Sequence, residues 1–270
     1  MKELINHITS QLLVCYPEDE ARSMAWWIAE ELTGLSRTQL QFGYKGTTNF
    51  PNLQTIIDRL LHFEPIQYIF GHTLWCGLDL KVTPATLIPR PETAELVERL
   101  KVKGERLKVL DVGTGSGCIA LALKKCHPEW QITGIDISAE AIEVAKENAV
   151  RNNVEVEFKV ADIFNFSDFN GDFDVVVSNP PYICEREKTT MRPNVLNYEP
   201  GTALFVPDDD PLLFYRYIAE LHMGTHLFFE INEAYAAEME NLLRETHYTD
   251  IQIHNDIYGK PRIIQARSTR

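Results

Sequence analysis

The tetrapeptide Asn179-Pro180-Pro181-Tyr182, which closely follows the apolar run Phe173–Val177, constrains the fold more than any other part of this sequence. A run rich in β-branched residues is typical of a strand buried in a parallel sheet. Two successive prolines continue neither a strand nor a helix, because each has a fixed φ and no amide hydrogen. The sequence therefore predicts a buried strand that ends in a stiff loop.

The residue types in this loop suit the binding of a planar NH2 group. The side-chain oxygen of Asn179 and the backbone carbonyl of Pro180 can each accept one of its two hydrogens. We expect Tyr182 to cover the flat face of the bound group. The alternative is a plain Pro-Pro turn that ends a strand, and a second motif upstream argues against it.

That second motif is the glycine loop Gly113-Thr114-Gly115-Ser116-Gly117, between a strand predicted over Val109–Val112 and a helix predicted over Cys118–Lys125. Glycines allow a sharp turn and a close approach of the backbone to a ligand, and the following helix N-terminus favours an anion. A dinucleotide fingerprint would place its third glycine at Cys118, and no Gly-Lys-Ser/Thr triphosphate motif is present. The spacing therefore argues against a dinucleotide or a nucleoside triphosphate as the ligand of this loop.

Two acidic residues follow the next two predicted strands. The strand Gln131–Ile135 leads to Asp136, at the place where a ribose-binding carboxylate is expected in a nucleotide-binding α/β unit. The strand Val154–Val160 leads to Asp162 and Ile163, which we expect to give an adenine one polar and one apolar contact. Either acid alone would suit a surface loop or a helix cap, but their order at successive strand ends favours a ligand with ribose and adenine.

The spacing of apolar residues predicts two domains. Apolar residues recur at helical spacing within 1–72, which predicts a small helical domain. An alternating stretch predicts a β-hairpin within a linker, 73–87. Strands then alternate with helices, so 88–270 is expected to form a doubly wound α/β domain with a mostly parallel sheet. Ile183–Asp209 is expected to be a long irregular loop and a candidate substrate cover.

The order of the glycine loop, Asp136, Asp162 and Asn-Pro-Pro-Tyr resembles the S-adenosylmethionine-dependent methyltransferases that modify exocyclic or amide nitrogens. Three further segments are similar to the protein-(glutamine-N5) methyltransferases that act on peptide chain release factors. The likeness runs from about Glu64 to Arg262 and departs at Glu230-Ile231-Asn232-Glu233, where the family more often has a glycine. The three segments are Glu64-Pro65-Ile66-Gln67-Tyr68-Ile69-Phe70-Gly71, Ile88-Pro89-Arg90-Pro91-Glu92-Thr93 and Tyr198-Glu199-Pro200.

This resemblance implies a seven-stranded, Rossmann-like class I methyltransferase sheet, S-adenosyl-L-methionine as the cofactor, and the glutamine of a release factor Gly-Gly-Gln tripeptide as the substrate. The helical domain would recognise the release factor. Catalysis would fall to Asn179, Pro180 and Tyr182, which with Pro181 would also bind the substrate. The implied cofactor-binding residues are Gly113, Thr114, Gly115, Ser116, Gly117, Asp136, Asp162, Ile163 and Asn179.

Composition and charge indicate which kinds of partner this protein is expected not to bind. A net charge of −13 argues against a protein that binds nucleic acid mainly through its phosphates. The polar start of the chain and the absence of an apolar run near ~20 residues predict a cytoplasmic protein without membrane contact. Five scattered cysteines and eight histidines show neither disulfide nor metal-ligand spacing, so we expect no metal.

Two other functions remain open at this point. An adenine N6 or guanine N2 methyltransferase would present the same planar NH2 group to the same loop, but it should carry a basic channel for the flipped base. A catalytically silent adaptor would use the fold only to bind another protein, and it would have no need of an intact glycine loop.

Overall fold

The computed structural model describes residues 1–42, 44, 46, 49–100, 104–165 and 172–270. The chain forms two compact units, and each is described by itself. The helical unit comprises Met1–Gly71 and Arg192–Tyr198, and the sheet unit comprises His72–Met191 and Glu199–Arg270. Within the described residues, the structure contains no helix with the length and apolar character that a membrane crossing requires.

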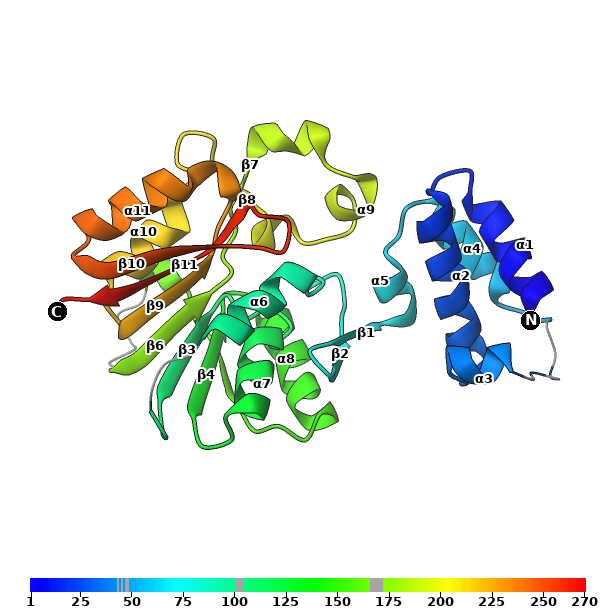
Figure 1. The fold of residues 1–270 in the computed structure, drawn as a ribbon, viewed down its shortest axis with the longest axis horizontal. Coiled ribbons are helices and arrows are strands. Elements are labelled where there is room, and N and C mark those ends of the chain that lie inside the picture. The colour runs from blue at the N-terminus through cyan, green and yellow to red at the C-terminus, as the bar shows by residue number, and fades with distance from the viewer. Residues whose placement is uncertain (43, 45, 47–48, 101–103, 166–171) are drawn as a thin grey trace. The chain divides into compact units, whose positions relative to one another are not determined.

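The helical unit is built on the apolar stripes expected from the sequence. Ala25 and Ile28 of one helix and Ile57 and Leu60 of another are fully or almost fully buried in one core. Gly34, with φ of 67°, ends the longest helix in the left-handed conformation that glycine adopts without strain. The helices are α1 (Lys2–Leu12), α2 (Glu18–Thr33), α3 (Arg37–Gln41), α4 (Leu53–Leu61) and α5 (Ile66–Phe70) (Figure 1).

One short segment from much later in the chain packs in the helical unit. It carries the helix α9 (Pro193–Leu196). Arg192 lies 2.9 Å from the Glu20 carboxylate, and the hydroxyl of Tyr198 donates to the carbonyl of His62 at 2.9 Å. The helical unit is therefore completed by residues that follow the Asn-Pro-Pro-Tyr loop.

The sheet unit contains a seven-stranded sheet with the order β10-β11-β9-β6-β3-β4-β5. β11 is antiparallel to both of its neighbours, whereas the other pairs are parallel. This confirms the predicted mostly parallel, seven-stranded sheet. The strands are β3 (Lys108–Val112), β4 (Gln131–Asp136), β5 (Glu157–Val160), β6 (Phe173–Ser178), β9 (Gly224–Glu230), β10 (Tyr248–Asn255) and β11 (Pro261–Ser268).

Helices cover both faces of this sheet (Figure 1). α6 (Pro91–Arg99), α7 (Cys118–Cys126) and α8 (Ala139–Arg151) pack on one face, and α10 (Leu213–Glu220) and α11 (Ala236–Glu245) pack on the other. Successive residues of β6 pack alternately in the two cores: Val175 and Val177 face the first set of helices, and Val176 faces the second. The doubly wound arrangement follows from strands that are apolar on both sides.

The predicted hairpin is formed by β1 (His72–Trp75) and β2 (Leu78–Lys81), and it belongs to the sheet unit. Asn148 of α8 holds it by accepting from the Lys81 amide at 2.6 Å and donating to the Lys81 carbonyl at 3.0 Å. Leu78 and Leu80 are fully buried in the core of the first face. These contacts fix the hairpin to the sheet unit.

The prediction of an irregular loop over Ile183–Asp209 was wrong. The segment contains β7 (Ile183–Cys184), η2 (Glu185–Thr190), α9, η3 (Gly201–Ala203) and β8 (Phe205–Val206), and β7 pairs with β8 in parallel. Elements of two to six residues are too short to show a hydrophobic period, so the sequence pattern does not reveal them.

Candidate active site

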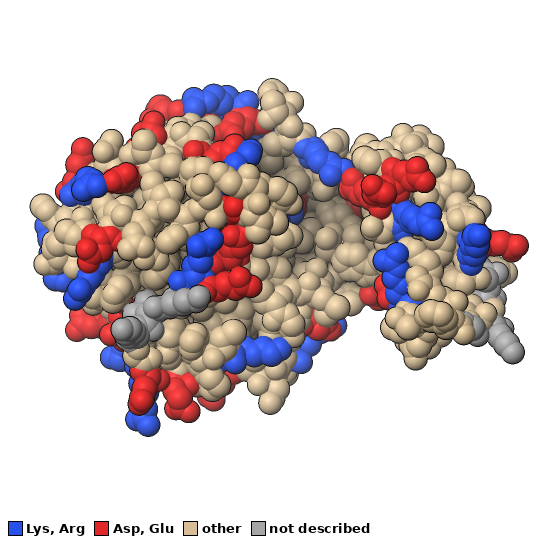
Figure 2. Space-filling view, viewed as in Figure 1, with Lys and Arg blue, Asp and Glu red and all other residues tan. Residues whose placement is uncertain are grey.

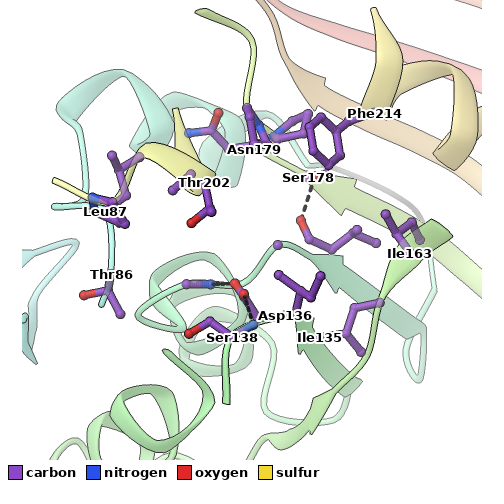
Figure 3. A pocket seen from close by; sticks show the side chains of 18 of the residues that line it. Thr86, Leu87, Ile135, Asp136, Ser138, Ile163, Ser178, Asn179, Thr202 and Phe214 are labelled. Carbon is purple, nitrogen blue, oxygen red and sulfur yellow. Dashed lines mark hydrogen bonds between the residues drawn. The ribbon is translucent and has the colours of Figure 1, made fainter. Parts of the chain in front are cut away.

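A pocket of about 380 Å³ lies at the carboxyl ends of β3, β4 and β6. The chain runs from β3 to β4 and β5 on one side of the sheet and then returns to β6 on the other, so the pocket lies where the strand order reverses. In open α/β sheets this is the place where ligands bind. Figure 3 shows Asp136, Ser178, Asn179 and Thr202 around it.

The glycine loop supplies one wall of the pocket with exposed backbone. Gly113 and Gly115 have φ of 70° and 55°, and a Cβ on either would meet no atom within 4 Å. Both line the pocket, as does Ser116. Bare backbone at this wall leaves room that side chains would occupy, which fits a ligand held against the loop.

Two other residues of the loop, Thr114 and Gly117, make contacts that fix the loop's conformation. The hydroxyl of Thr114 donates to the buried Asp111 carboxylate at 2.6 Å. Gly117 has φ of 80°, and a Cβ there would lie 3.0 Å from the Phe158 ring. Neither Thr114 nor Gly117 is among the described residues that line the pocket. We therefore assign them to the conformation of the loop.

Asp136 joins the end of β4 to the glycine loop. One carboxylate oxygen accepts from the Gly115 amide and the other from the Ser138 amide, both at 2.9 Å (Figure 3). Burial raises the pKa of Asp136, and the two backbone donors oppose that rise. Each oxygen keeps a further lone pair, so the carboxylate can still accept from the two hydroxyls of a ribose.

Asp162 and Ile163 also line the pocket. The Asp162 carboxylate accepts from the Phe164 amide at 2.9 Å and from the Asn165 side chain at 2.7 Å, so it also begins the short helix η1 (Ile163–Asn165). Phe164 and Phe214, whose ring centres are 5.1 Å apart, add an aromatic wall. A flat base fits between such apolar surfaces, and Phe214 carries no local sequence signal for this role.

Asn179, Pro180 and Pro181 line the pocket at the end of β6, directly after Ser178. The Ser178 hydroxyl donates to the Val112 carbonyl of β3 at 2.6 Å and fixes the strand end (Figure 3). The side-chain NH2 of Asn179 donates to the Thr93 hydroxyl at 3.2 Å. The structure thus brings Asn179 and Asp136 to one pocket, as expected from their places after parallel strands.

Tyr182 lies elsewhere than the sequence suggested. It is not among the described residues that line the pocket. Its hydroxyl donates to the buried Glu230 carboxylate at 3.1 Å, and its side chain packs against the second core of the sheet. Burial and the nearby Glu230 raise the pKa of Tyr182 far above its usual range. In this conformation its ring does not cover a group bound in the pocket.

The departure at Glu230-Ile231-Asn232-Glu233 has a simple local structure. Asn232 accepts from the Ala234 amide at 3.0 Å and begins the short helix η4 (Glu233–Tyr235). Its side chain also donates to the Tyr182 carbonyl at 3.3 Å. The chain therefore turns here with an asparagine cap and keeps contact with the Asn-Pro-Pro-Tyr loop.

Sequence reasoning assigned no role to Arg90 and Glu199, although both lie in segments that carry the resemblance. The Glu199 side chain is 1% exposed, lies 2.6 Å from the Arg90 guanidinium, and accepts from the Ile88 amide at 3.2 Å. Arg90 lines the pocket, and so does Pro200 beside Glu199. This buried carboxylate therefore connects the segment of Ile88 and Arg90 with the segment of Glu199 and Pro200, more than a hundred residues later in the sequence.

We expect Glu199→Ala to destabilise the sheet unit by about 2 kcal/mol, because it leaves the Ile88 amide and Arg90 without their acceptor. For a chain of this size, that corresponds to a fall of roughly 5 °C in the thermal midpoint. Glu199→Gln, which keeps one acceptor, is the matched control and should lose less. An unchanged midpoint for the alanine variant would show that the two segments are held together by other contacts.

Within the described residues, no group of three or more His, Cys, Asp or Glu side chains is placed to hold a metal ion. The pocket instead offers a carboxylate, bare glycine backbone and an aromatic wall, together with an asparagine amide. This set fits a nucleoside-bearing cofactor next to a planar NH2 group.

Known proteins share both the sequence and the fold of this chain. Residues 3–71 match the family model of the PrmC N-terminal domain, and residues 91–196 match that of the methyltransferase small domain. A release factor glutamine methyltransferase of Bacteroides thetaiotaomicron is 41% identical over 276 residues, covering 98% of this chain and 99% of the relative. One from Streptococcus pneumoniae is 41% identical over 259 residues, covering 91% of each chain.

Solved structures share the fold at lower identity. The hMettl16 catalytic domain in complex with a MAT2A 3'UTR hairpin has a TM-score of 0.56 at 19% identity, covering 72% of this chain and 76% of that one. A methyltransferase from Pyrococcus furiosus has a TM-score of 0.52 at 18% identity, covering 81% and 98%. These likenesses show a methyltransferase fold. Because the sequence similarity to the curated relatives spans nearly the full length of both chains, this chain belongs to the release factor glutamine methyltransferase family.

Proposed function

We propose that this protein transfers the methyl group of S-adenosyl-L-methionine to the side-chain amide nitrogen, N5, of the glutamine in the Gly-Gly-Gln motif of peptide chain release factors. The observation that supports this most is that Asn179 and Asp136 line one pocket. The near full-length similarity to release factor glutamine methyltransferases supports the choice of substrate. A cytoplasmic location, where release factors act on ribosomes, agrees with this proposal.

The pocket residues suit S-adenosylmethionine. Asp136 would accept from the ribose hydroxyls, the backbone of Gly113 and Gly115 would lie against the amino-acid part, and Asp162 with Ile163 would contact the adenine. When bound, the cofactor supplies an electrophilic methyl group on a sulfonium. The protein's task is then to present a nucleophile to that methyl in line and at short range.

Asn179 and Pro180 would present the glutamine amide. A carboxamide nitrogen is a weak nucleophile because its lone pair is delocalised into the carbonyl. If the Asn179 side-chain oxygen and the Pro180 carbonyl each accept one N–H, they orient the nitrogen and stabilise the positive charge that develops on it. No strong base is needed before transfer, because the methylated nitrogen is acidic and can lose its proton to water.

Methylation of an exocyclic base amine is the second candidate, since the same loop could hold it. The charge distribution argues against it. Figure 2 shows Lys and Arg interspersed with Asp and Glu on the face displayed, and the net charge of the chain is −13. A base-flipping enzyme is expected to offer a continuous basic surface to the phosphates.

Incubation with radiolabelled S-adenosylmethionine and, separately, release factor, tRNA, rRNA or DNA tests the proposal. We expect label on release factor alone, and loss of that label when the Gly-Gly-Gln glutamine is replaced by alanine. Label on a nucleic acid instead of on release factor would overturn the proposal. Cofactor binding without transfer to any of these would favour an adaptor.

We also propose that the helical unit recognises the release factor. A chain lacking residues 1–71 is expected to bind cofactor normally and to methylate a short Gly-Gly-Gln peptide, but to lose about 30-fold or more in kcat/KM on intact release factor, the scale of one or two interface hot spots. Arg192→Ala is the control, because it removes only the contact of the later segment with Glu20. Equal activity of truncated and full-length chains on release factor would place recognition in the sheet unit.

A further inference from the structure

A buried series of hydrogen bonds connects Asn179 with Glu230 through Thr93, which also lines the pocket. The Asn179 NH2 donates to the Thr93 hydroxyl at 3.2 Å, and the Thr93 hydroxyl donates to the Glu230 carboxylate at 2.7 Å. The other Glu230 oxygen accepts from Tyr182 at 3.1 Å. Thr93 and Glu230 are 2% and 1% exposed, so water does not compete for these contacts. Thr93 lies in α6 and Glu230 ends β9, so two regular elements fix the positions of these hydrogen-bonding side chains.

The donors and acceptors in this series of hydrogen bonds allow only one orientation of the Asn179 amide. A threonine hydroxyl has a single hydrogen, and Thr93 donates it to the Glu230 carboxylate at 2.7 Å. Since Thr93 gives its hydrogen to Glu230, its oxygen can only accept from Asn179. Asn179 must therefore direct its NH2 towards Thr93, which leaves its oxygen for another partner. No other described residue donates to that oxygen.

We propose that Glu230 and Thr93 are positioning residues that fix the Asn179 amide so that its oxygen accepts from the substrate NH2. This inference rests on the proposed function and adds to it the origin of the amide orientation. An asparagine amide has nearly the same shape after a half-turn, so packing alone distinguishes the two orientations weakly. The flipped amide would set an NH2 group against the substrate NH2 group, and neither could accept.

The surroundings of Glu230 support its role as an acceptor. Burial raises the pKa of Glu230, while the hydrogen bonds from Thr93 and Tyr182 and the charge of Arg262 oppose that rise. Glu92 is the nearby group of like charge. Two hydroxyl donors, one on each carboxylate oxygen, make Glu230 the acceptor in both contacts.

Thr93→Val is the central test, because it removes the hydroxyl and keeps the side-chain shape. With saturating cofactor and release factor, we expect its single-turnover rate to fall about 10-fold, the scale of one hydrogen bond of ~1.4 kcal/mol. Cofactor affinity should change little, since Thr93 lines the pocket but is not among the residues proposed to bind the cofactor. Thr93→Ser, which restores the hydroxyl, should return the rate to within a few-fold of the parent.

A double-mutant cycle separates positioning from general destabilisation. In an Asn179→Ala background there is no amide to orient, so Thr93→Val should cause no further loss of rate. The same 10-fold loss in that background, or a Thr93→Val rate within twofold of the parent, would overturn the inference. If Thr93→Val does not fold, Thr93→Ala, which also removes the hydroxyl, replaces it in the cycle, with the same expectation of no further loss beside Asn179→Ala. Failure of the parent protein to label release factor would instead count against the proposed function.

Discussion

Replacing Asn179 with alanine is expected to lower the single-turnover rate of glutamine methylation by about 10²–10³, the usual cost of losing one preorganised hydrogen bond in a transition state. The side chain lines the pocket beside Pro180 and Pro181, and the loss removes an acceptor that would act on the substrate nitrogen. Cofactor affinity should change little. Quench-flow measurement with saturating cofactor and release factor, together with calorimetry of cofactor binding, gives both quantities.

Asn179→Asp is the matched control for geometry. The carboxylate keeps an acceptor and the same length, but it cannot donate to the Thr93 hydroxyl, whose hydrogen goes to Glu230. It also adds a negative charge near the position of the sulfonium. We therefore expect Asn179→Asp to lose rate as well, with equal or tighter cofactor binding. A rate for Asn179→Ala within a few-fold of the parent would rule out the proposed mechanism.

The sequence could predict the sheet and the strand ends of the site because both depend on local patterns. Consecutive β-branched residues such as Val175, Val176 and Val177 require burial on both sides, and in a doubly wound fold this is a central parallel strand. The carboxyl ends of parallel strands lie at one edge of the sheet. Asp136 and Asn179 therefore had to lie near each other once both were placed directly after strands.

The hydrogen-bond partners at the site could not be predicted in the same way. Thr93 is 86 residues from Asn179 and 137 from Glu230, and no periodicity connects residues at such separations. The buried Glu199 likewise meets Arg90 across 109 residues. Glu199 stands in a segment that carries the family resemblance and Glu230 in the segment where the likeness departs, but the partners of both became visible only in three dimensions.

Tyr182 shows why residue type alone is an unreliable guide to a side chain's target. An aromatic ring beside a polar loop suggests stacking on the ligand, yet a tyrosine hydroxyl also seeks a buried acceptor. Glu230 provides that acceptor at 3.1 Å and draws the side chain towards the core. The direction of Tyr182 follows from its hydrogen bond to the buried Glu230 carboxylate of β9, a residue that the local sequence around Tyr182 does not contain.

The second large effect is expected at Asp136. Asp136→Ala should weaken the binding of S-adenosylmethionine by about 10²-fold or more, because it would remove the ionised acceptor that we propose for two ribose hydroxyls, and each such bond contributes ~1.5–3 kcal/mol. The same carboxylate also accepts from the Gly115 and Ser138 amides, so part of the loss would come from a less ordered glycine loop. Asp136→Asn keeps the size and one acceptor, and it should retain part of the affinity.

The pH dependence of binding separates a direct contact from support of the loop. Since burial raises the pKa of Asp136, the carboxylate takes up a proton at a higher pH than an exposed aspartate does. Cofactor affinity of the parent protein should therefore fall as the pH is lowered through that raised pKa, whereas Asp136→Asn should not show this fall. Calorimetric titrations of both proteins across the acid range provide the measurement, with thermal unfolding as the check on folding. Undiminished affinity in Asp136→Ala would remove this residue from the cofactor site and return it to the role of an acceptor for the glycine loop.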